Sequence, residues 1–462
     1  MNTPHPSRVF AATAISIVAL VLTGCDAIEG GQASDAVEPL VLSSFWDSST
    51  VHAIDVVFDQ SDYDSLIETY RQSGEKVWIT ATVTIDGVSY ENAGFKLKGN
   101  SSLRGLSEGT NANTDAECPE TLPWIIRLDK FVDGQNHEGS TEFAVRGNNS
   151  ETSLNEALAL DLLDLAGLAA EEASAIEFTV AGSDPILRLV VENPNDAWME
   201  RELGDGYLYK AETGGDYSYR GDDPDAYDEI FDQEGGEDNL DPLVDFLEFV
   251  NLSDDEAFAA ELGDWLDLEA FATYLAFQEL VDNFDDIDGP GNNSYLYFDP
   301  DTSLMTVVNW DLNLAFGLGP GGEGDARPGG QARVLPEGRD GLLPGDQGVT
   351  PPDGGFPALR PDGQSVTPPD GQVAEDRLPL GGERPGGAGG GNVLSERFLA
   401  DPGFEALYRS ALDDLTALFY GSGFADEALA SWTNTLLEGA SDLVDPSVIE
   451  REAAAIAQVF PQ

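Results

Sequence analysis

The stretch DNFDDIDGPGNNSYLYFDPDTSLMTVVNWD, residues 282–311, decides the fold of the region where polar side chains concentrate. It begins with an acidic loop and continues with two β-branched and aromatic runs, 294–298 and 304–308. The residues between these runs, 299–303, are of the polar and proline types that form turns. Two such runs around a short turn predict a β-hairpin.

This hairpin gathers three oxygen-bearing side chains. The expected cross-strand partners are Phe298 with Leu304 and Ser294 with Val308. Asn293 and Asp311 then leave the hairpin at the same end, because antiparallel strands bring the start of one beside the finish of the other. Asp285 lies in the loop that joins directly to that end. We therefore expect these three side chains to converge.

Two carboxylates and an amide suit a magnesium-dependent phosphoryl-transfer site. One carboxylate and one amide oxygen can hold Mg²⁺, while the second carboxylate orients an acceptor hydroxyl. The alternative is that an acid-rich chain brings Asp and Asn together in turns through composition alone. An EF-hand is excluded, because Phe284 would occupy its first ligand position.

The rest of the chain shows strand-like runs first and helical periodicity later. The strand candidates are 77–85, 94–99, 124–128, 142–145, 176–180 and 186–192, and the later helix candidates are 242–250, 254–262 and 264–282. A hairpin turn is expected at Asp86-Gly87. In the second strand, alternation places Phe95 and Leu97 inward and the two lysines on the other face. This order predicts an α+β fold.

A helix is expected to open after Ser153 and to stop near Gly167. Ser153 and Glu156 have the spacing of a capping box, in which each side chain bonds the other residue's backbone N–H. Leucines at helical spacing follow, with Leu154 and Leu158 on one stripe.

Composition excludes several classes of protein. The 462 residues carry 22 Lys+Arg and 86 Asp+Glu, a formal net charge of −64, so a nucleic-acid partner bound through a broad basic face is not expected. Cys25 and Cys118 are too few for a disulfide framework or a zinc cluster. His52 and His137 lie in no nucleophile motif, which disfavours a Ser-His-Asp triad. The lysines are few: Lys76, Lys96, Lys98, Lys130 and Lys210.

The N-terminus is typical of a secretion signal. An apolar run, 9–22, is too short for a comfortable membrane span, and the following Thr23-Gly24-Cys25 resembles the bacterial lipobox. We expect a lipoprotein signal peptide over 1–24, lipidation of Cys25 and a tether over 25–49. The protein would then be anchored by lipid to the extracytoplasmic face of the cell membrane. The alternative is an ordinary signal peptide with a chance cysteine.

Residues 318–393 form a low-complexity segment of Gly, Pro, Asp and Arg. The pieces VTPPDGG and VTPPDGQ recur within it, starting at Val349 and Val366. Such a composition cannot bury enough apolar surface to offset its ordering entropy, so a disordered insert is predicted. Helical periodicity resumes after it. One domain over 50–317 and 394–460 is therefore expected to be interrupted by this insert.

Several motifs occur in the order found in one protein family. They are GFKLKGNSS at 94–102, VVE at 190–192, GYLYK at 206–210, NFD at 283–285, NSYLY at 293–297 and WDLN at 310–313. Together they resemble the CotH family of spore-coat protein kinases, over roughly 50–317 and 394–460. The resemblance implies an atypical protein-kinase-like fold of two lobes, the first β-rich and the second mainly helical. It also implies binding of ATP and Mg²⁺ and phosphorylation of Ser or Thr on proteins.

The resemblance assigns roles by position. Asp285 would be the catalytic aspartate, and Asn293 and Asp311 the metal ligands. Lys96, Lys98 and Arg127 are candidates for contacts with nucleotide phosphates. Glu156 would be the helix glutamate that pairs with a lysine, although the capping box explains it equally well.

Two functions compete on these observations. The first is an ATP-dependent protein kinase held at the cell surface. The second is a surface interaction or adhesion protein that keeps the kinase-like fold with weak catalysis or none, which fits the scarcity of ATP outside cells. A structural lipoprotein that binds cations is a third possibility.

Overall fold

The computed structural model describes most of the chain after residue 43. The described residues are 44–99, 101–103, 106, 116–147, 149–212, 215–228, 230–283, 285–287, 293–318 and 392–461. The predicted signal peptide, the lipidation residue Cys25, most of the predicted tether and nearly all of the predicted insert lie outside them. Within these described ranges, no helix has both the length and the apolar character needed to cross a membrane.

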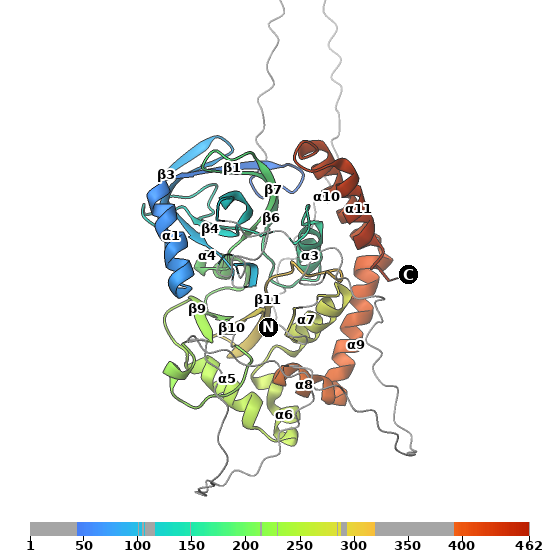
Figure 1. The fold of residues 1–462 in the computed structure, drawn as a ribbon. Helices are drawn as coiled ribbons and strands as arrows, with labels where there is room; N and C mark the ends of the chain where they lie inside the picture. Colours follow the sequence, from blue (N-terminus) through green and yellow to red (C-terminus); the bar gives the residue numbers. More distant parts are fainter. Residues whose placement is uncertain are drawn as a thin grey trace, which may run out of the picture. The chain divides into compact units, whose positions relative to one another are not determined.

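Seven strands form a barrel: β1 (His52–Phe58), β2 (Ile79–Ile85), β3 (Val88–Leu97), β4 (Trp124–Arg127), β5 (Glu142–Val145), β6 (Ala173–Val180) and β7 (Ile186–Glu192). Their order is β1-β2-β3-β4-β5-β7-β6. Figure 1 shows β1, β3, β4, β6 and β7 close together. The barrel closes through parallel pairing of β1 with β6, and its other neighbours are antiparallel. Closure leaves none of these strands with a free edge.

The turn between β2 and β3 forms as predicted. Asp86 and Gly87 have φ angles of 46° and 80°, and Ile85 pairs directly with Val88. A two-residue turn of this kind needs positive φ at both positions, which Asp-Gly accommodates at low cost.

The inward face of β3 also agrees with the predicted alternation. Phe95 and Leu97 are fully buried, and the Phe95 ring stacks on Trp124 with 3.9 Å between centroids. Lys96 and Lys98 lie on the opposite face and are half-buried. The strand therefore lines the barrel interior and presents Lys96, with Lys98 directly after the strand, on the outside.

The helix α1 (Gln60–Ser73) was not expected from the sequence. It begins at the cap Asp59, whose carboxylate accepts from the Ser61 N–H, and it ends at the left-handed Gly74. It buries Tyr63 and Leu66 against the barrel core. Its buried residues Tyr63, Leu66, Ile67 and Tyr70 have the i, i+3, i+4, i+7 spacing of an amphipathic helix, so the sequence carried a signal for α1 that the prediction overlooked.

A second sheet has four strands: β8 (Tyr207–Ala211), β9 (Phe231–Gly235), β10 (Ser294–Asp299) and β11 (Leu304–Asn309). Their order is β11-β10-β8-β9, all antiparallel. The predicted β10–β11 hairpin is therefore present and lies at one side of this sheet.

The register of the hairpin differs by one residue from the prediction. Ser294 pairs with Asn309 and Asp299 with Leu304, so Phe298 does not face Leu304. Asp299 extends the strand because its carboxylate accepts hydrogen bonds from the Asp301 N–H and the Thr302 hydroxyl, fixing the turn. The prediction paired the two runs symmetrically. It did not allow for an Asp side chain that accepts hydrogen bonds within the turn that follows it.

The remaining elements are helical. They are α3 (Leu154–Leu165), α4 (Asp196–Glu202), α5 (Asp241–Leu252), α6 (Asp255–Glu261), α7 (Leu268–Leu280), α8 (Val393–Ala400), α9 (Pro402–Thr416), α10 (Phe424–Gly439) and α11 (Pro446–Ala457). Helix α7 packs on α9, and α3 packs on α10 (Figure 1). Helices from both sides of residues 319–391 thus share one hydrophobic core. The fold is mixed α+β, as predicted.

The start of α3 agrees with the prediction, but its capping box does not form. Ser153 adopts a left-handed conformation with φ 54°, and its side chain makes no capping hydrogen bond. Glu156 is buried and bonds to an arginine, as described below. The contact of Glu156 with this arginine therefore replaces the hydrogen bond expected within the capping box.

Candidate active site

A buried arginine joins three parts of the fold. Arg146 follows β5, and its Nε and Nη2 atoms lie 3.0 Å and 2.8 Å from the two carboxylate oxygens of Glu156 on α3. The side chains are only 7% and 4% exposed. The guanidinium also contacts the carboxylate of Asp311, just after β11. A two-pronged pair of this kind fixes direction as well as charge.

Trp310 forms one wall of this cluster. The Nζ atom of Lys98 lies 4.3 Å from its ring centroid, and the Arg146 guanidinium carbon lies 5.6 Å from it. Both distances suit cation–π attraction. Burial lowers the pKa of Lys98 well below its usual value, and repulsion from Arg146 adds to the shift. Lys98, Arg146, Glu156, Trp310 and Asp311 thus form one charged group, called here the Arg146 cluster.

The backbone at Asp311 is unusual for a residue with a side chain. Its φ angle is 64°, in the left-handed region. Such a conformation costs free energy in a non-glycine residue and persists where surrounding contacts hold it. Here the chain turns sharply after β11, which sets the Asp311 carboxylate against Arg146.

Asp285 and Asn293 form a second polar pair. The Asn293 amide donates to the Asp285 carboxylate at 2.8 Å and to its backbone carbonyl at 3.2 Å. Desolvation raises the pKa of Asp285, and the Asn293 hydrogen bond opposes that shift. The predicted proximity of these two residues is therefore present.

A chain of buried amides connects the loop before Asp285 with the strand that ends before Asp311. The Asn283 amide donates to Gln278 at 3.0 Å, and the Gln278 amide donates to Asn309 at 2.7 Å. All three side chains are buried. They hold the two turns in fixed relation to each other, because each hydrogen bond inside the protein has no competing water.

Two predicted phosphate contacts lie outside the Arg146 cluster. Lys96 is 4.6 Å from the Trp78 ring centroid, and Arg127 bonds to Asp129 and Glu142 at 2.8 Å and 3.1 Å. The structure thus brings Lys98, Glu156 and Asp311 together, and it pairs Asp285 with Asn293.

Sequence reasoning assigned no role to Arg146 or Gln278, and it named Trp310 only as part of the motif at 310–313. Arg146 directly follows a short apolar strand, and Trp310 precedes Asp311. An arginine at the end of a buried strand is a usable signal for an ion pair, but nothing in the sequence names its partner.

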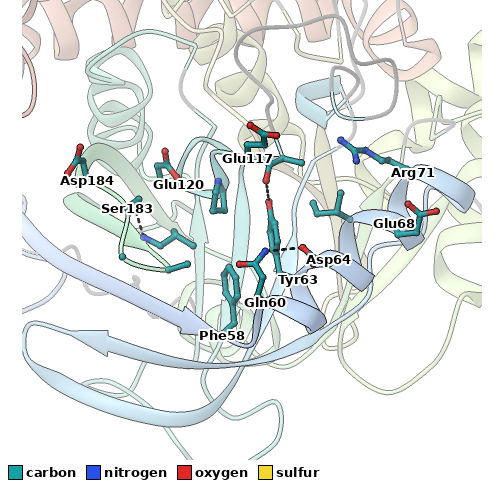
Figure 2. A pocket seen from close by; sticks show the side chains of 16 residues that line it. Phe58, Gln60, Tyr63, Asp64, Glu68, Arg71, Glu117, Glu120, Ser183 and Asp184 are labelled. Atoms are coloured by element: carbon teal, nitrogen blue, oxygen red, sulfur yellow. Dashed lines mark hydrogen bonds between the residues drawn. The ribbon is translucent and has the colours of Figure 1, made fainter.

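A pocket of about 900 Å³ lies elsewhere, between α1 and the turn joining β6 to β7 (Figure 2). Tyr63 closes one side of it through a hydrogen bond to the Ala116 carbonyl at 2.8 Å. None of the predicted site residues lines this pocket. Its size is therefore no argument for placing the chemistry there.

The donor set near the hairpin suits a hard cation with few protein ligands. Among the described residues, no group of three or more His, Cys, Asp or Glu side chains could hold a metal ion by itself. Asp311 and the Asn293 oxygen offer one carboxylate and one amide, and Mg²⁺ commonly takes one or two protein oxygens with substrate phosphates and water. The chemistry of these two donors fits Mg²⁺, while the contacts in the structure join Asp311 to Arg146 and Asn293 to Asp285.

One protein-family model matches much of the chain. The family model described as CotH kinase protein matches residues 96–431, more than half of the chain. That range contains the whole Arg146 cluster and the Asp285–Asn293 pair. A search of curated proteins gave no match. The chain belongs to the CotH kinase protein family.

Proposed function

We propose that this protein is an ATP- and Mg²⁺-dependent kinase that phosphorylates Ser or Thr residues of proteins. The observation that carries the proposal is the Arg146 cluster, in which Arg146 binds Glu156 and Asp311 beside Lys98. Protein kinases place a cation paired with a helix glutamate next to a metal-binding aspartate. Here an arginine takes the place of the expected lysine.

The proposed fold is a two-lobed, protein-kinase-like one. The barrel of β1–β7 would be the β-rich first lobe, and the second sheet with α5–α11 the mainly helical second lobe. The domain would span 50–317 and 394–460 around the insert 318–393. The support is the change from strands to helices along the chain and the core shared by helices before and after the insert.

Each side chain of the site has a role in this reaction. Lys98 and Arg146 would bind the nucleotide phosphates, and Asp285 would accept the proton of the acceptor hydroxyl. The hydroxyl oxygen bonds to the γ-phosphorus, the bond from that phosphorus to the bridging oxygen of ADP breaks, and the hydroxyl proton passes to Asp285. Burial raises the pKa of Asp285, which makes its carboxylate a better proton acceptor.

Asp311 and Asn293 would hold the metal ion. When bound, Mg²⁺ neutralises charge on the transferred phosphate. Asn293 would act twice: its amide nitrogen orients the Asp285 carboxylate, and its oxygen would bind the cation.

The proposed location is the extracytoplasmic face of the cell membrane, through a lipid on Cys25 and the tether 25–49. The support is the lipobox-like sequence before Cys25.

One observation favours the alternative of a surface interaction or adhesion protein without turnover. The Asp311 carboxylate contacts Arg146, so a guanidinium competes with any metal ion for that oxygen. A protein that keeps the fold for binding alone would retain this ion pair.

A phosphate-transfer assay distinguishes the kinase from an interaction protein without turnover. The full-length protein is incubated with γ-labelled ATP, Mg²⁺ and a Ser/Thr protein mixture, and compared with Asp285→Asn and Asp311→Asn. We expect each variant to lose transfer at least about 100-fold. The matched control is Asp301→Asn, at the exposed turn of the same hairpin. No incorporation by the wild type, or incorporation that survives both changes, would refute the kinase proposal.

A further inference from the structure

The segment that leads into α3 is held by a side chain from a distant part of the chain. Glu452 lies on α11, and its carboxylate oxygens accept hydrogen bonds from the backbone N–H groups of Glu151 and Thr152, each at 3.0 Å. The carboxylate also accepts from the Thr152 hydroxyl. Thr152 and Glu452 are 300 residues apart and are 5% and 4% exposed. A buried carboxylate with three such donors is held in one position.

Glu452 and Thr152 together supply the helix cap that Ser153 does not. The Ser153 side chain makes no capping hydrogen bond. Instead, the Thr152 hydroxyl accepts from the Leu154 N–H at 3.3 Å while it donates to Glu452. Amide groups at the start of a helix need such acceptors, and a negative charge nearby is favourable. The start of α3 therefore depends on α11, which packs against α3 together with α10 (Figure 1).

The first turn of α3 is connected to the chain around Asp311 by two routes. The Asn155 side chain is buried, and its amide donates to the Asn313 carbonyl at 2.8 Å. Glu156 binds Arg146, which contacts Asp311. Both routes end in the chain that follows β11. A shift at the start of α3 would therefore reach Asp311 at two points.

Apolar packing alone would hold this turn less closely. The leucines of α3 lie in the core shared by the helices, and hydrophobic attraction has no preferred direction. Hydrogen bonds to a charged group are directional, so the contacts of Glu452 limit how far the start of the helix can move. Glu452 also lies beyond residues 96–431, the range that the family model matches, so that match gives it no role.

We propose that Glu452 is a positioning residue for the proposed reaction. Its carboxylate holds the start of α3, and the helix in turn sets the Asp311 carboxylate that would hold Mg²⁺. This rests on the proposed kinase function and adds a residue that does not touch the substrate. Contacts behind a metal ligand orient it, and their loss lowers metal affinity as well as rate. Loss of the Glu452 contacts should therefore weaken Mg²⁺ binding together with phosphate transfer.

The main variant is Glu452→Gln, which keeps the shape but places an NH₂ group against N–H donors. The full-length protein is assayed with γ-labelled ATP and the Ser/Thr protein mixture over a range of Mg²⁺ concentrations. We expect the half-saturating Mg²⁺ concentration to rise about three- to tenfold, and the rate at saturating Mg²⁺ to fall at least about tenfold. A purely structural role would reduce the amount of folded protein and leave the half-saturating concentration unchanged.

A milder second variant covers the case in which Glu452→Gln folds poorly. Thr152→Val removes only the hydroxyl between Glu452 and the Leu154 N–H. It should raise the half-saturating Mg²⁺ concentration about two- to threefold, and it should add little in the Glu452→Gln background, since both changes break one network.

Two control variants separate position from stability. Glu450→Gln is the same change at an exposed position of α11, and it should leave transfer and its Mg²⁺ dependence unchanged. Trp432→Phe removes a hydrogen bond of 2.8 Å to Asp161, in a later turn of α3. It should lower the free energy of unfolding without changing the half-saturating Mg²⁺ concentration, because the first turn of α3 keeps its contacts.

Hydrogen exchange gives a readout that needs neither nucleotide nor metal. In Glu452→Gln, the amides of 151–157 should exchange at least about tenfold faster than in the wild type, and those of 309–315 should also exchange faster. Amides of β2 should keep their wild-type rates, which excludes global unfolding as the cause.

Two results would overturn the positioning role. One is an unchanged half-saturating Mg²⁺ concentration in variants that still transfer phosphate, and the other is faster exchange at 151–157 with no change at 309–315. Failure of the kinase proposal looks different, because the wild type then transfers no phosphate. Exchange at 309–315 in that case decides alone whether Glu452 positions the chain around Asp311: faster exchange supports it, and an unchanged rate refutes it.

Discussion

Arg146 and Glu156 form a buried ion pair in which both carboxylate oxygens are used, at 3.0 Å and 2.8 Å. The pair joins the end of a barrel strand to the first turn of α3. Because the same arginine contacts Asp311, the position of the proposed metal ligand depends on a helix far from it in sequence. The ion pair that joins two elements of the fold therefore also positions the proposed metal ligand.

Removing one partner of this pair should be costly. In Glu156→Gln the guanidinium of Arg146 stays buried but loses a charged partner, and we expect a loss of about 3–5 kcal/mol in the free energy of unfolding. Urea unfolding at pH 7 measures it. The exposed pair of Glu405 with Arg409 supplies the control, since Glu405→Gln should change stability by less than about 1 kcal/mol. Equal effects of the two changes would show that burial of the pair is unimportant.

Ionisation of Glu171 should lower the free energy of unfolding as the pH rises. Glu171 is 4% exposed, its carboxylate has no hydrogen-bond partner in another described residue, and burial raises its pKa to about 8. The folded state therefore binds this proton more tightly than the unfolded state. Its contribution is present in full below about pH 4.5 and is lost as the pH rises through about 8.

The variant Glu171→Gln keeps the shape and cannot ionise. We expect it to match the wild type near pH 5 and to exceed it by on the order of 3–5 kcal/mol at pH 9, since each unit of pKa shift corresponds to about 1.4 kcal/mol. Chemical unfolding at both pH values gives the difference. Glu177→Gln, at an exposed position of β6, should show no such trend. A constant gap between Glu171→Gln and the wild type would contradict the shift.

Local elements were predictable because their signals are local. The Asp86-Gly87 turn, the strand at 142–145 and the helix beginning at Leu154 each follow from turn residues and periodicity within a few positions. Closure of the barrel was not predictable, because β1 pairs with β6 across more than a hundred residues, as in His52 with Ile176. No periodicity within one strand specifies such a partner.

In the candidate site, too, local contacts were predictable and long-range contacts were not. Asp285 and Asn293 border one hairpin, so their proximity followed from the chain's own geometry. The partner of Glu156 could not be predicted in this way. Tertiary packing placed Arg146 against Glu156, and the capping box did not form. Lys96 and Lys98 looked equivalent on one face of β3, and only the placement of Trp78 and Trp310 separates them.

Phe45 should anchor the start of the folded domain, although it lies within the predicted tether. Its side chain is 1% exposed and packs on Phe143 with 5.2 Å between ring centroids. Its N–H donates to Glu138 and its carbonyl accepts from the Ser174 hydroxyl. Phe45→Ala should cost about 3–5 kcal/mol in thermal or urea unfolding. Phe131→Ala, at a position 49% exposed, is the control, and a similar loss there would argue against an anchor.

Gln278 should act as a positioning residue for the proposed reaction, because it bonds to Asn283 before the Asp285 loop and to Asn309 before Asp311. Gln278→Met keeps the approximate volume but leaves two buried amides unpaired, so we expect a stability loss of about 2–4 kcal/mol. At temperatures where the variant remains folded, phosphate transfer should fall more than tenfold, as expected for misplaced reacting groups, while affinity for ATP stays within about threefold. A purely structural role would instead lower transfer and nucleotide binding together, in proportion to the folded fraction. Gln72→Met is the control, since Gln72 is exposed on α1 and bonds only within its own helix, to Glu68 at 2.5 Å.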